Sequence, residues 1–208
     1  MNNVFFTPKN GEQIKIGDYY YKDGTLSHEY QKEKECIGIV FSISGTFKFP
    51  NGSVVALKDA KNADENNLHL WRNTQGRANN ELVNKKNKEI GNHKEELKTD
   101  YGGFFYCEHI TDEEYVAINI AKSFPVELPE EQTSGWYLPS SGQMYQIAQH
   151  FIDKNNLNTQ KILLNLADTY MVSQAKETVF PLYLDLKEKR YMYGKAENSF
   201  LIRPVFTF

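Results

Sequence analysis

The sequence predicts an α+β domain, with a twisted, mainly antiparallel sheet flanked by two principal helices. Three observations predict this class. Aromatic and β-branched residues form short runs near both ends of the chain, one continuous apolar run follows the first turn, and two helix starts are marked in the middle. Among its 208 residues we see no Pro-, Gly- or Ser-rich linker and no internal repeat. We therefore expect one domain over residues 1–208.

The first sixty residues predict strands and turns. "GDYYYKDGTLS" places Asp23-Gly24 between aromatic-rich flanks, which is a hairpin signal. "CIGIVFSISG" (residues 36–45) is a continuous apolar run, typical of a central strand covered on both faces. "FPNGSVVALKDA" predicts a turn at residues 50–52 and a strand over residues 54–57. Residues 61–100 are polar, and we expect a long excursion with some helix there.

The first principal helix is predicted over residues 112–123. Thr111 and Glu114 have the spacing of a capping box, in which the glutamate reaches back to the amide of the cap residue. Apolar residues follow at helical spacing, and Pro125 disfavours helical geometry in Phe124. The helix is therefore expected to end just before Phe124.

The second principal helix is predicted over residues 141–154, within and just after "GWYLPSSGQMYQIAQHF". Ser140 and Gln143 form another capping-box pair, and an apolar stripe of three turns follows. Ser140 or Ser141 could be read as a nucleophile, but His150 lies more than two turns along the helix, so no triad can be built locally. We interpret the junction as scaffold. The residues expected in the core are Trp136, Leu138, Ile147, Phe151 and Ile39.

The last fifty residues predict a short helix and then strands. The helix is expected from about Thr159 in "NTQKILLNLA". The strands are expected in "TVFPLYLDL", "RYMYGK" and "FLIRPVFTF", with "KEK" (residues 187–189) as the turn between the first two. We expect the final strand, with Leu201, Val205 and Phe206, to join the same sheet as the N-terminal strands.

Composition and charge restrict the partners. The formal net charge is −3, which argues against a nucleic-acid partner because binding phosphates needs a basic face. No run of about 18 apolar residues is present, so we expect no membrane span. No signal peptide is visible in "MNNVFFTPKNGEQ", and Met1 is either the true start or a replacement for a trimmed export signal.

The sequence shows no pattern typical of metal, cofactor or thiol chemistry. The five histidines show no zinc spacing, and Asp59, Asp64 and Glu65 form a loose acidic group that we interpret as a solvated surface rather than a cation site. "YGGFF" (residues 101–105) is expected to lead into a strand, which excludes a phosphate loop before a helix. Cys36 and Cys107 could pair, but two buried free thiols are favoured. We expect no cofactor and no metal.

The chain carries a family resemblance over nearly its whole length, strongest at residues 135–138 and 200–208. "GWYLPSSGQMYQI" resembles the "GWxLPSxxEL" junction of bacterial C-type-lectin-like domains, a group common in Bacteroidetes and related to the DUF1566 and formylglycine-generating-enzyme-like domains. The ending "YMVSQAKETVFPLYLDLKEKRYMYGKAENSFLIRPVFTF" is similar to the strand-strand-strand ending of that group. The chain departs from the pattern at residues 170–174 and at Gln143, where the group has Trp-Ser-Ser and an acidic residue. The resemblance implies a C-type-lectin-like fold.

The resemblance also implies a function. It points to a non-enzymatic recognition module, exported or on the cell surface, that binds a glycan or a protein. One alternative is an enzyme of the formylglycine-generating type or an unrecognised hydrolase, although the reactive cysteines of the former lie late in the domain and the last cysteine here is Cys107. The other alternative is a structural subunit of a pilus or phage-like assembly.

A ligand is expected at the loops between the last strands, which commonly carry recognition in this fold. Tyrosines supply flat contact area and basic groups supply directed donors. Tyr191 and Tyr193 have strand spacing, so the alternative is that both merely cover one face of the sheet. The predicted ligand-binding residues are Trp71, Tyr170, Gln174, Arg190, Tyr191, Tyr193 and Lys195.

Overall fold

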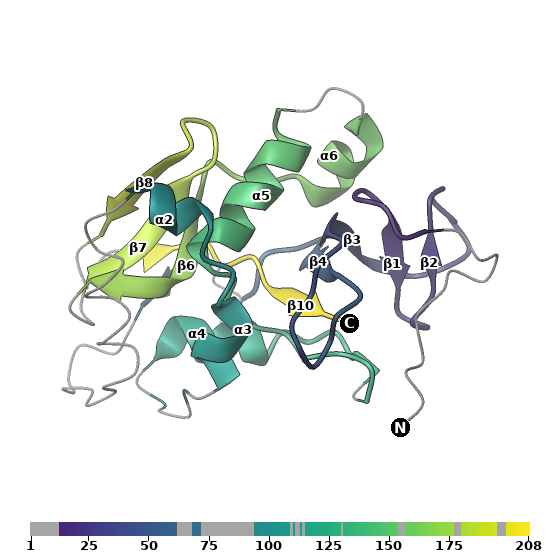
Figure 1. Cartoon of the computed structure of the whole chain (residues 1–208), viewed down its shortest axis with the longest axis horizontal. Helices are drawn as coiled ribbons and strands as arrows, with labels where there is room; N and C mark the ends of the chain where they lie inside the picture. The colour runs from purple at the N-terminus through teal and green to yellow at the C-terminus, as the bar shows by residue number, and fades with distance from the viewer. Residues whose placement is uncertain are drawn as a thin grey trace.

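The computed structural model describes residues 13–61, 68–71, 94–108, 110, 113, 115–129, 131–153, 157–176, 180–194 and 199–208 (Figure 1). Its strands are β1 (Tyr19–Tyr21), β2 (Leu26–Ser27), β3 (Cys36–Ser42), β4 (Ser53–Ala56), β5 (His69–Leu70), β6 (Thr169–Lys176), β7 (Phe180–Asp185), β8 (Arg190–Tyr193), β9 (Ser199–Phe200) and β10 (Val205–Thr207). Its helices are α2 (Lys94–Lys98), α3 (Gly103–Glu108), α4 (Val116–Lys122), α5 (Ser141–Phe151) and α6 (Asn158–Leu164). The fold is α+β with antiparallel sheets, as the sequence predicts.

The largest sheet joins the two ends of the chain. Its order is β10-β4-β3-β1-β2, so the apolar run of β3 forms the central strand, as predicted, and five consecutive residues of it are buried. Gly38 stands where β4 comes closest, because an added Cβ would lie 2.3 Å from Val54 Cγ1. The predicted Asp23-Gly24 hairpin is confirmed between β1 and β2. Before β4 the chain bends at Asn51, within the predicted turn.

Two further sheets complete the fold, so the expectation of a single sheet is wrong. The order β6-β7-β8 makes a three-stranded sheet, and β5 pairs with β9. Leu201 forms an isolated parallel bridge with Tyr170 and does not belong to β10. Pro204 has no N–H for a ladder, and the strand of the large sheet begins only after it, at Val205. The three-stranded sheet and the β1–β2 hairpin lie at opposite ends of the molecule (Figure 1).

Helix α5 lies between the sheets and contacts β3, β6 and β7 (Figure 1). Its start is as predicted: Ser140 and Gln143 form the capping box, with the Ser140 N–H donating to Gln143 Oε1 at 3.0 Å. The helix ends at Phe151, three residues before the predicted end. All five residues expected in the core are at most 6% exposed, which confirms them as interior residues.

Helix α4 begins at Val116, four residues later than predicted. Thr111 and Glu114 of the predicted capping box lie outside the described residues, and Glu113 is in a turn. The N-cap is Tyr115, whose ring is fully buried and meets the Trp71 ring edge-on at 5.8 Å. The start of α4 therefore coincides with a tyrosine held in the core.

Helix α3 replaces the strand expected after residues 101–105. The Asp100 carboxylate accepts the Gly102 N–H at 2.8 Å, just before the helix begins. A Cβ on Gly103 would lie 2.3 Å from Gln143 Oε1, so glycine allows the start of α3 to pack directly on the start of α5. This contact between distant segments is the reason that a local pattern does not predict the helix.

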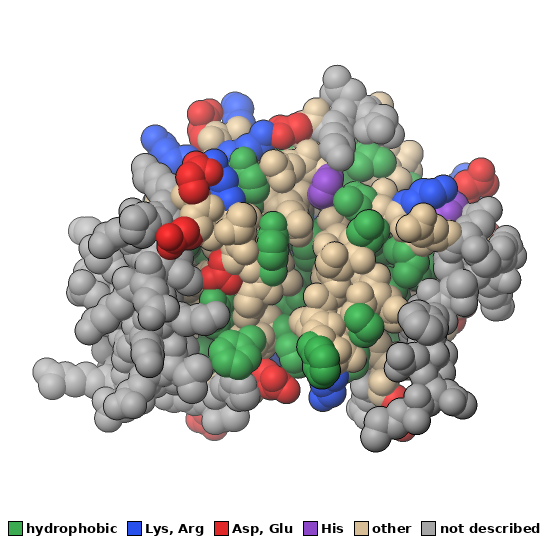
Figure 2. Space-filling view, viewed as in Figure 1, with side chains coloured by type: hydrophobic (Ala, Val, Ile, Leu, Met, Phe, Trp, Pro, Cys, Tyr) green, Lys and Arg blue, Asp and Glu red, His purple; other side chains and the backbone are tan. Residues whose placement is uncertain are grey.

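Charges of both signs are mixed on the face shown in Figure 2. Basic and acidic side chains alternate over the β8 and α2 end, and hydrophobic side chains are spread across the middle. Two of the ion pairs are Lys98–Glu95 and Lys189–Asp153. Within the described ranges, no helix combines the length and the apolar character that crossing a membrane requires.

Candidate functional site

Two of the residues predicted to bind a ligand lie in the interior. Trp71 is fully buried against Tyr115, and Tyr170 is fully buried as well. The Tyr170 hydroxyl accepts a hydrogen bond from Arg203 Nη2 at 3.0 Å, and the guanidinium lies over the tyrosine ring, 5.5 Å from its centroid. These two aromatic residues therefore contribute to packing, and neither is exposed on the surface.

Arg203 bonds to three segments of the chain, and one of them is the strand that carries the buried Tyr170. Arg203 Nε donates to Asp59 Oδ1 at 2.6 Å, and Nη1 donates to the carbonyls of Leu164 at 2.8 Å and Ala56 at 3.1 Å. The arginine is only 2% exposed, so the ion pair and these hydrogen bonds compensate the cost of burying its charge. Asp59 is thus committed to Arg203, and the other two members of the predicted acidic group, Asp64 and Glu65, lie outside the described residues.

Gln174 and Tyr191 are buried around the start of α5. Gln174 Oε1 accepts the Ser141 N–H at 3.0 Å, and its Nε2 donates to Ser141 Oγ at 3.1 Å. Ser141 Oγ in turn donates to the Leu97 carbonyl at 2.7 Å. The Tyr191 hydroxyl donates to the Ser141 carbonyl at 3.2 Å. Every polar group of Ser141 therefore has an internal partner, which supports the interpretation of this junction as scaffold.

Only Arg190 and Tyr193, at the two ends of β8, are exposed among the described residues predicted to bind. Tyr193 is 39% exposed, whereas Tyr191 is 7% exposed. Lys195 lies outside the described residues. The structure therefore does not bring the predicted residues together on one surface, because four of them are buried in the interior.

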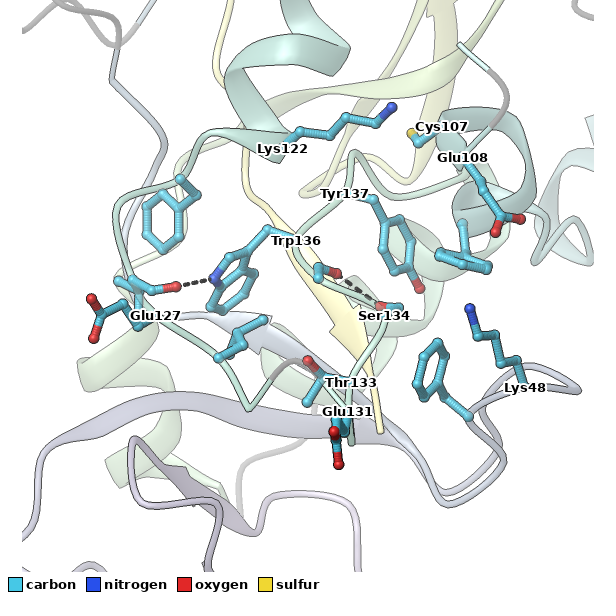
Figure 3. A pocket seen from close by; sticks show the side chains of 16 residues that line it. Lys48, Cys107, Glu108, Lys122, Glu127, Glu131, Thr133, Ser134, Trp136 and Tyr137 are labelled. Atoms are coloured by element: carbon cyan, nitrogen blue, oxygen red, sulfur yellow. Dashed lines mark hydrogen bonds between the residues drawn. The ribbon is translucent and has the colours of Figure 1, made fainter. Parts of the chain in front are cut away.

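The described residues enclose a groove of about 960 Å³ elsewhere, beside the segment that leads into α5 (Figure 3). We call it the aromatic groove. Its apolar lining is supplied by the loop after β3, by α3 and by the connection from α4 to α5, through Phe49, Phe104, Phe124, Val126, Leu128, Trp136 and Tyr137. Sites that bind other molecules are commonly concave and largely apolar, with a few polar groups.

The aromatic groove has charged groups around it. Lys48 lies over the Phe49 ring, 5.4 Å from its centroid, and Lys122 Nζ donates to the Ile110 carbonyl at 2.7 Å. Glu108, Glu127 and Glu131 are exposed, and none of the three forms an ion pair with a described residue. The groove therefore combines an apolar lining with carboxylates that are open to a ligand.

Residues 134–137, which we call the edge segment, determine where the groove runs. The segment lies beside β10: Tyr137 and Val205 exchange both backbone hydrogen bonds, at 2.8 and 3.0 Å, and the Ser134 N–H donates to the Thr207 carbonyl at 2.9 Å. Trp136 and Tyr137 are consecutive and project to opposite sides of the segment, yet both line the groove (Figure 3). The groove therefore follows the outer edge of the large sheet and does not lie over one of its faces.

Each side of the edge segment has its own aromatic packing. On one side, the Trp136 ring meets Phe124 at 5.0 Å and Phe206 at 4.8 Å, and its Nε1 donates to the Val126 carbonyl at 2.7 Å. On the other side, the Tyr137 ring meets Phe104 at 5.8 Å. These contacts fix both walls of the groove before any ligand arrives.

The thiols are not poised for chemistry. Cys107 contributes to the lining of the groove, but it is 1% exposed and its Sγ donates to the Leu138 carbonyl at 3.5 Å. Burial raises the pKa of the Cys107 thiol to about 12 and that of Cys36 to about 11. Both thiols are therefore protonated at neutral pH. Both are free, as the sequence interpretation favours, but only Cys107 is buried and Cys36 is half-buried. No group of three or more potential metal ligands occurs in the described part of the chain.

Comparison with known proteins shows the fold. No family model and no curated protein matches the sequence. The structure is similar to the crystal structure of a fimbrial protein from Bacteroides ovatus, with a TM-score of 0.52 and 19% sequence identity. The match covers 94% of this chain and 49% of that protein, so this chain spans about half the length of its structural neighbour.

The aromatic groove was missed by sequence reasoning, although one signal was present. In "SFPVELPEEQTSGW", Phe124, Val126 and Leu128 alternate as in a strand, but Pro125 and Pro129 interrupt the pattern. Such a segment cannot enter the interior of a sheet, since each proline lacks an N–H. This extended apolar segment, which cannot join a sheet, lines the groove instead.

Proposed function

We propose that this chain is a non-enzymatic recognition domain of a fimbria-type surface protein, and that the aromatic groove is its binding site. The observation that carries the proposal is the groove itself: it is large, its walls are preformed, and its carboxylates are open. The likeness to a fimbrial protein supports a surface role. The protonated thiols, and the internal partners of Ser141, support a role without nucleophilic catalysis.

We also propose that the fold is C-type-lectin-like and that residues 1–208 form one domain. The pairing of N-terminal and C-terminal strands in one sheet, together with a separate three-stranded sheet on the other side of α5, supports both proposals. The binding site would then lie at the outer edge of the large sheet rather than at the loops of β6–β8.

The test is a capture experiment with two matched variants. The labelled chain is applied to a glycan array. The immobilised chain is incubated with a surface-protein extract from the organism that encodes it. Leu128→Glu places a charge on the half-buried apolar wall of the groove, and Tyr193→Ala removes an exposed ring from β8. We expect capture by the parent chain to be lost with Leu128→Glu and kept with Tyr193→Ala. Loss with Tyr193→Ala alone would contradict the proposal.

A further inference from the structure

The outer edge of the edge segment carries backbone groups that have no hydrogen-bond partner among the described residues. Tyr137 turns its N–H and C=O toward β10, so the N–H and C=O of Trp136 point the other way. Neither backbone group of Trp136 has a hydrogen-bond partner among the described residues, whereas its indole Nε1 is bonded to Val126. The indole of Trp136 is therefore fixed in the fold, whereas its backbone donor and acceptor are unpaired within the described part of the chain.

Space for a second chain lies next to these groups. Gly135 has φ +71°, and a Cβ added there would meet nothing within 4 Å. Gly135 and Trp136 both line the groove. An open donor and acceptor on one strand-like residue, with free space beside it, form the kind of edge to which an extended chain can add.

We propose that the occupant of the aromatic groove is an extended polypeptide segment of a partner protein, which adds as a strand to the outer edge of residues 134–137. The backbone of the segment would pair with the N–H and C=O of Trp136. Its side chains would alternate between the two walls, one wall formed by Phe124, Val126 and Leu128 and the other by Phe49 and Phe104.

A polypeptide fits these features better than a glycan does. A strand presents a donor and an acceptor at the spacing that Trp136 presents, and its alternating side chains match a groove with one apolar wall on each side of the edge. A sugar chain has hydroxyl groups on all sides and lacks the regular backbone donors and acceptors that pair with the edge of a sheet. This inference rests on the proposed function, because it names the partner class of the same groove.

The experiment uses peptides selected by the chain itself. A displayed library of random 12-residue peptides is selected on the immobilised protein, and the best peptide is resynthesised with one N-methylated amide at a time. N-methylation removes a donor without changing a side chain. We expect affinity to fall about tenfold at amides that face Trp136 and to stay unchanged at their neighbours, because one lost hydrogen bond is worth about a factor of ten.

A variant of the protein gives an independent test. Asparagine tolerates positive φ better than other residues with a side chain, so Gly135→Asn fills the open space with less backbone strain than other substitutions at this position. We expect this variant to keep its unfolding midpoint within a few degrees and to lose peptide binding at least tenfold. Tyr193→Ala serves as the control and is expected to bind the peptide as the parent chain does.

The outcomes separate this inference from the proposed function. Peptides that are lost with Leu128→Glu but tolerate N-methylation at every position would overturn strand addition and leave the groove as the binding site. The same holds if no peptide is selected while the glycan array gives capture that depends on Leu128. If neither peptides nor surface partners depend on the groove, both proposals fail.

Discussion

The three-stranded sheet and the outer edge of the five-stranded sheet are both rich in aromatic residues, but they use them differently. Around β6–β8, Tyr170 and Tyr191 are buried, with their hydroxyl groups bonded to Arg203 and to the Ser141 carbonyl. At the edge segment, the Trp136 and Tyr137 rings are also buried, but the backbone N–H and C=O of Trp136 have no partner among the described residues, and both residues line a groove. Aromatic content therefore does not distinguish the two regions, whereas an unpaired backbone edge beside a groove does.

The largest loss of stability is expected from replacing Arg203, whose charge is buried in the interior. Arg203→Met removes the partner of Asp59 and leaves the Tyr170 hydroxyl without its donor from the arginine. Breaking a buried ion pair by removing one partner costs about 3–5 kcal/mol. We expect the free energy of unfolding, measured in urea, to fall by that amount. A loss below about 1 kcal/mol, within the range of surface substitutions, would show that this arginine does not hold the segments together.

The apolar junction is expected to be nearly as sensitive. Leu138 is fully buried and Phe151 is 2% exposed, so replacing either by alanine leaves a cavity that costs about 2–5 kcal/mol. Chemical denaturation of both variants measures the loss. If either variant unfolds at the denaturant concentration of the parent chain, residues 135–151 are not the scaffold that we describe.

A substitution at Gln174 distinguishes a structural role from a binding role in the region where the sequence predicts the ligand. Gln174→Ala leaves the buried Ser141 N–H without its acceptor, which costs about 1–3 kcal/mol. We expect the free energy of unfolding to fall by that amount, while capture of partners or selected peptides by the folded variant stays unchanged. Weakened capture with no loss of stability would restore Gln174 as a ligand-binding residue.

The sequence predicts the large sheet, the start of α5 and the core well because these features depend on local patterns. The β3 run, the Asp23-Gly24 turn and the Ser140–Gln143 pair each act within a few residues. Helix α3 and the start of α4 depend on contacts with distant segments, through Gly103 on Gln143 and Tyr115 on Trp71. No local pattern reports such contacts.

The site could not be predicted for the same reason. The groove is formed by the loop after β3, by α3 and by residues 124–137, which meet only in the folded chain. Trp71, Tyr170 and Gln174 have residue types that suit a binding surface, and residue type alone does not reveal that a side chain is buried. The interrupted alternation at Phe124, Val126 and Leu128 was the one local signal.

The reactivity of the two cysteine thiols gives a further test of the account, with an effect of intermediate size. With a pKa of about 11, about one Cys36 thiol in a thousand is ionised at pH 8, and fewer at Cys107, whose pKa is about 12. We expect iodoacetamide to leave both cysteines unmodified in the folded protein at pH 8 and to modify both after unfolding in urea, as read by mass spectrometry. Rapid alkylation of Cys107 in the folded state would reopen the case for thiol chemistry in the groove.

The smallest effect on stability and capture is expected from Tyr193→Ala, at the end of β8. Tyr193 is 39% exposed, and surface substitutions usually change stability by less than about 0.5 kcal/mol. Tyr193→Ala should therefore unfold like the parent chain and should capture the same partners. A selective loss of capture would move the site back to the loops of the three-stranded sheet.

The most direct test compares two adjacent amides in the free protein. The Tyr137 N–H donates to the Val205 carbonyl, whereas the Trp136 N–H has no partner among the described residues. Hydrogen exchange followed by NMR is expected to show a strongly protected Tyr137 amide beside a Trp136 amide that exchanges without protection. Adding a selected peptide should then protect Trp136. Equal protection of both amides in the free protein would contradict the open edge on which this account of binding depends.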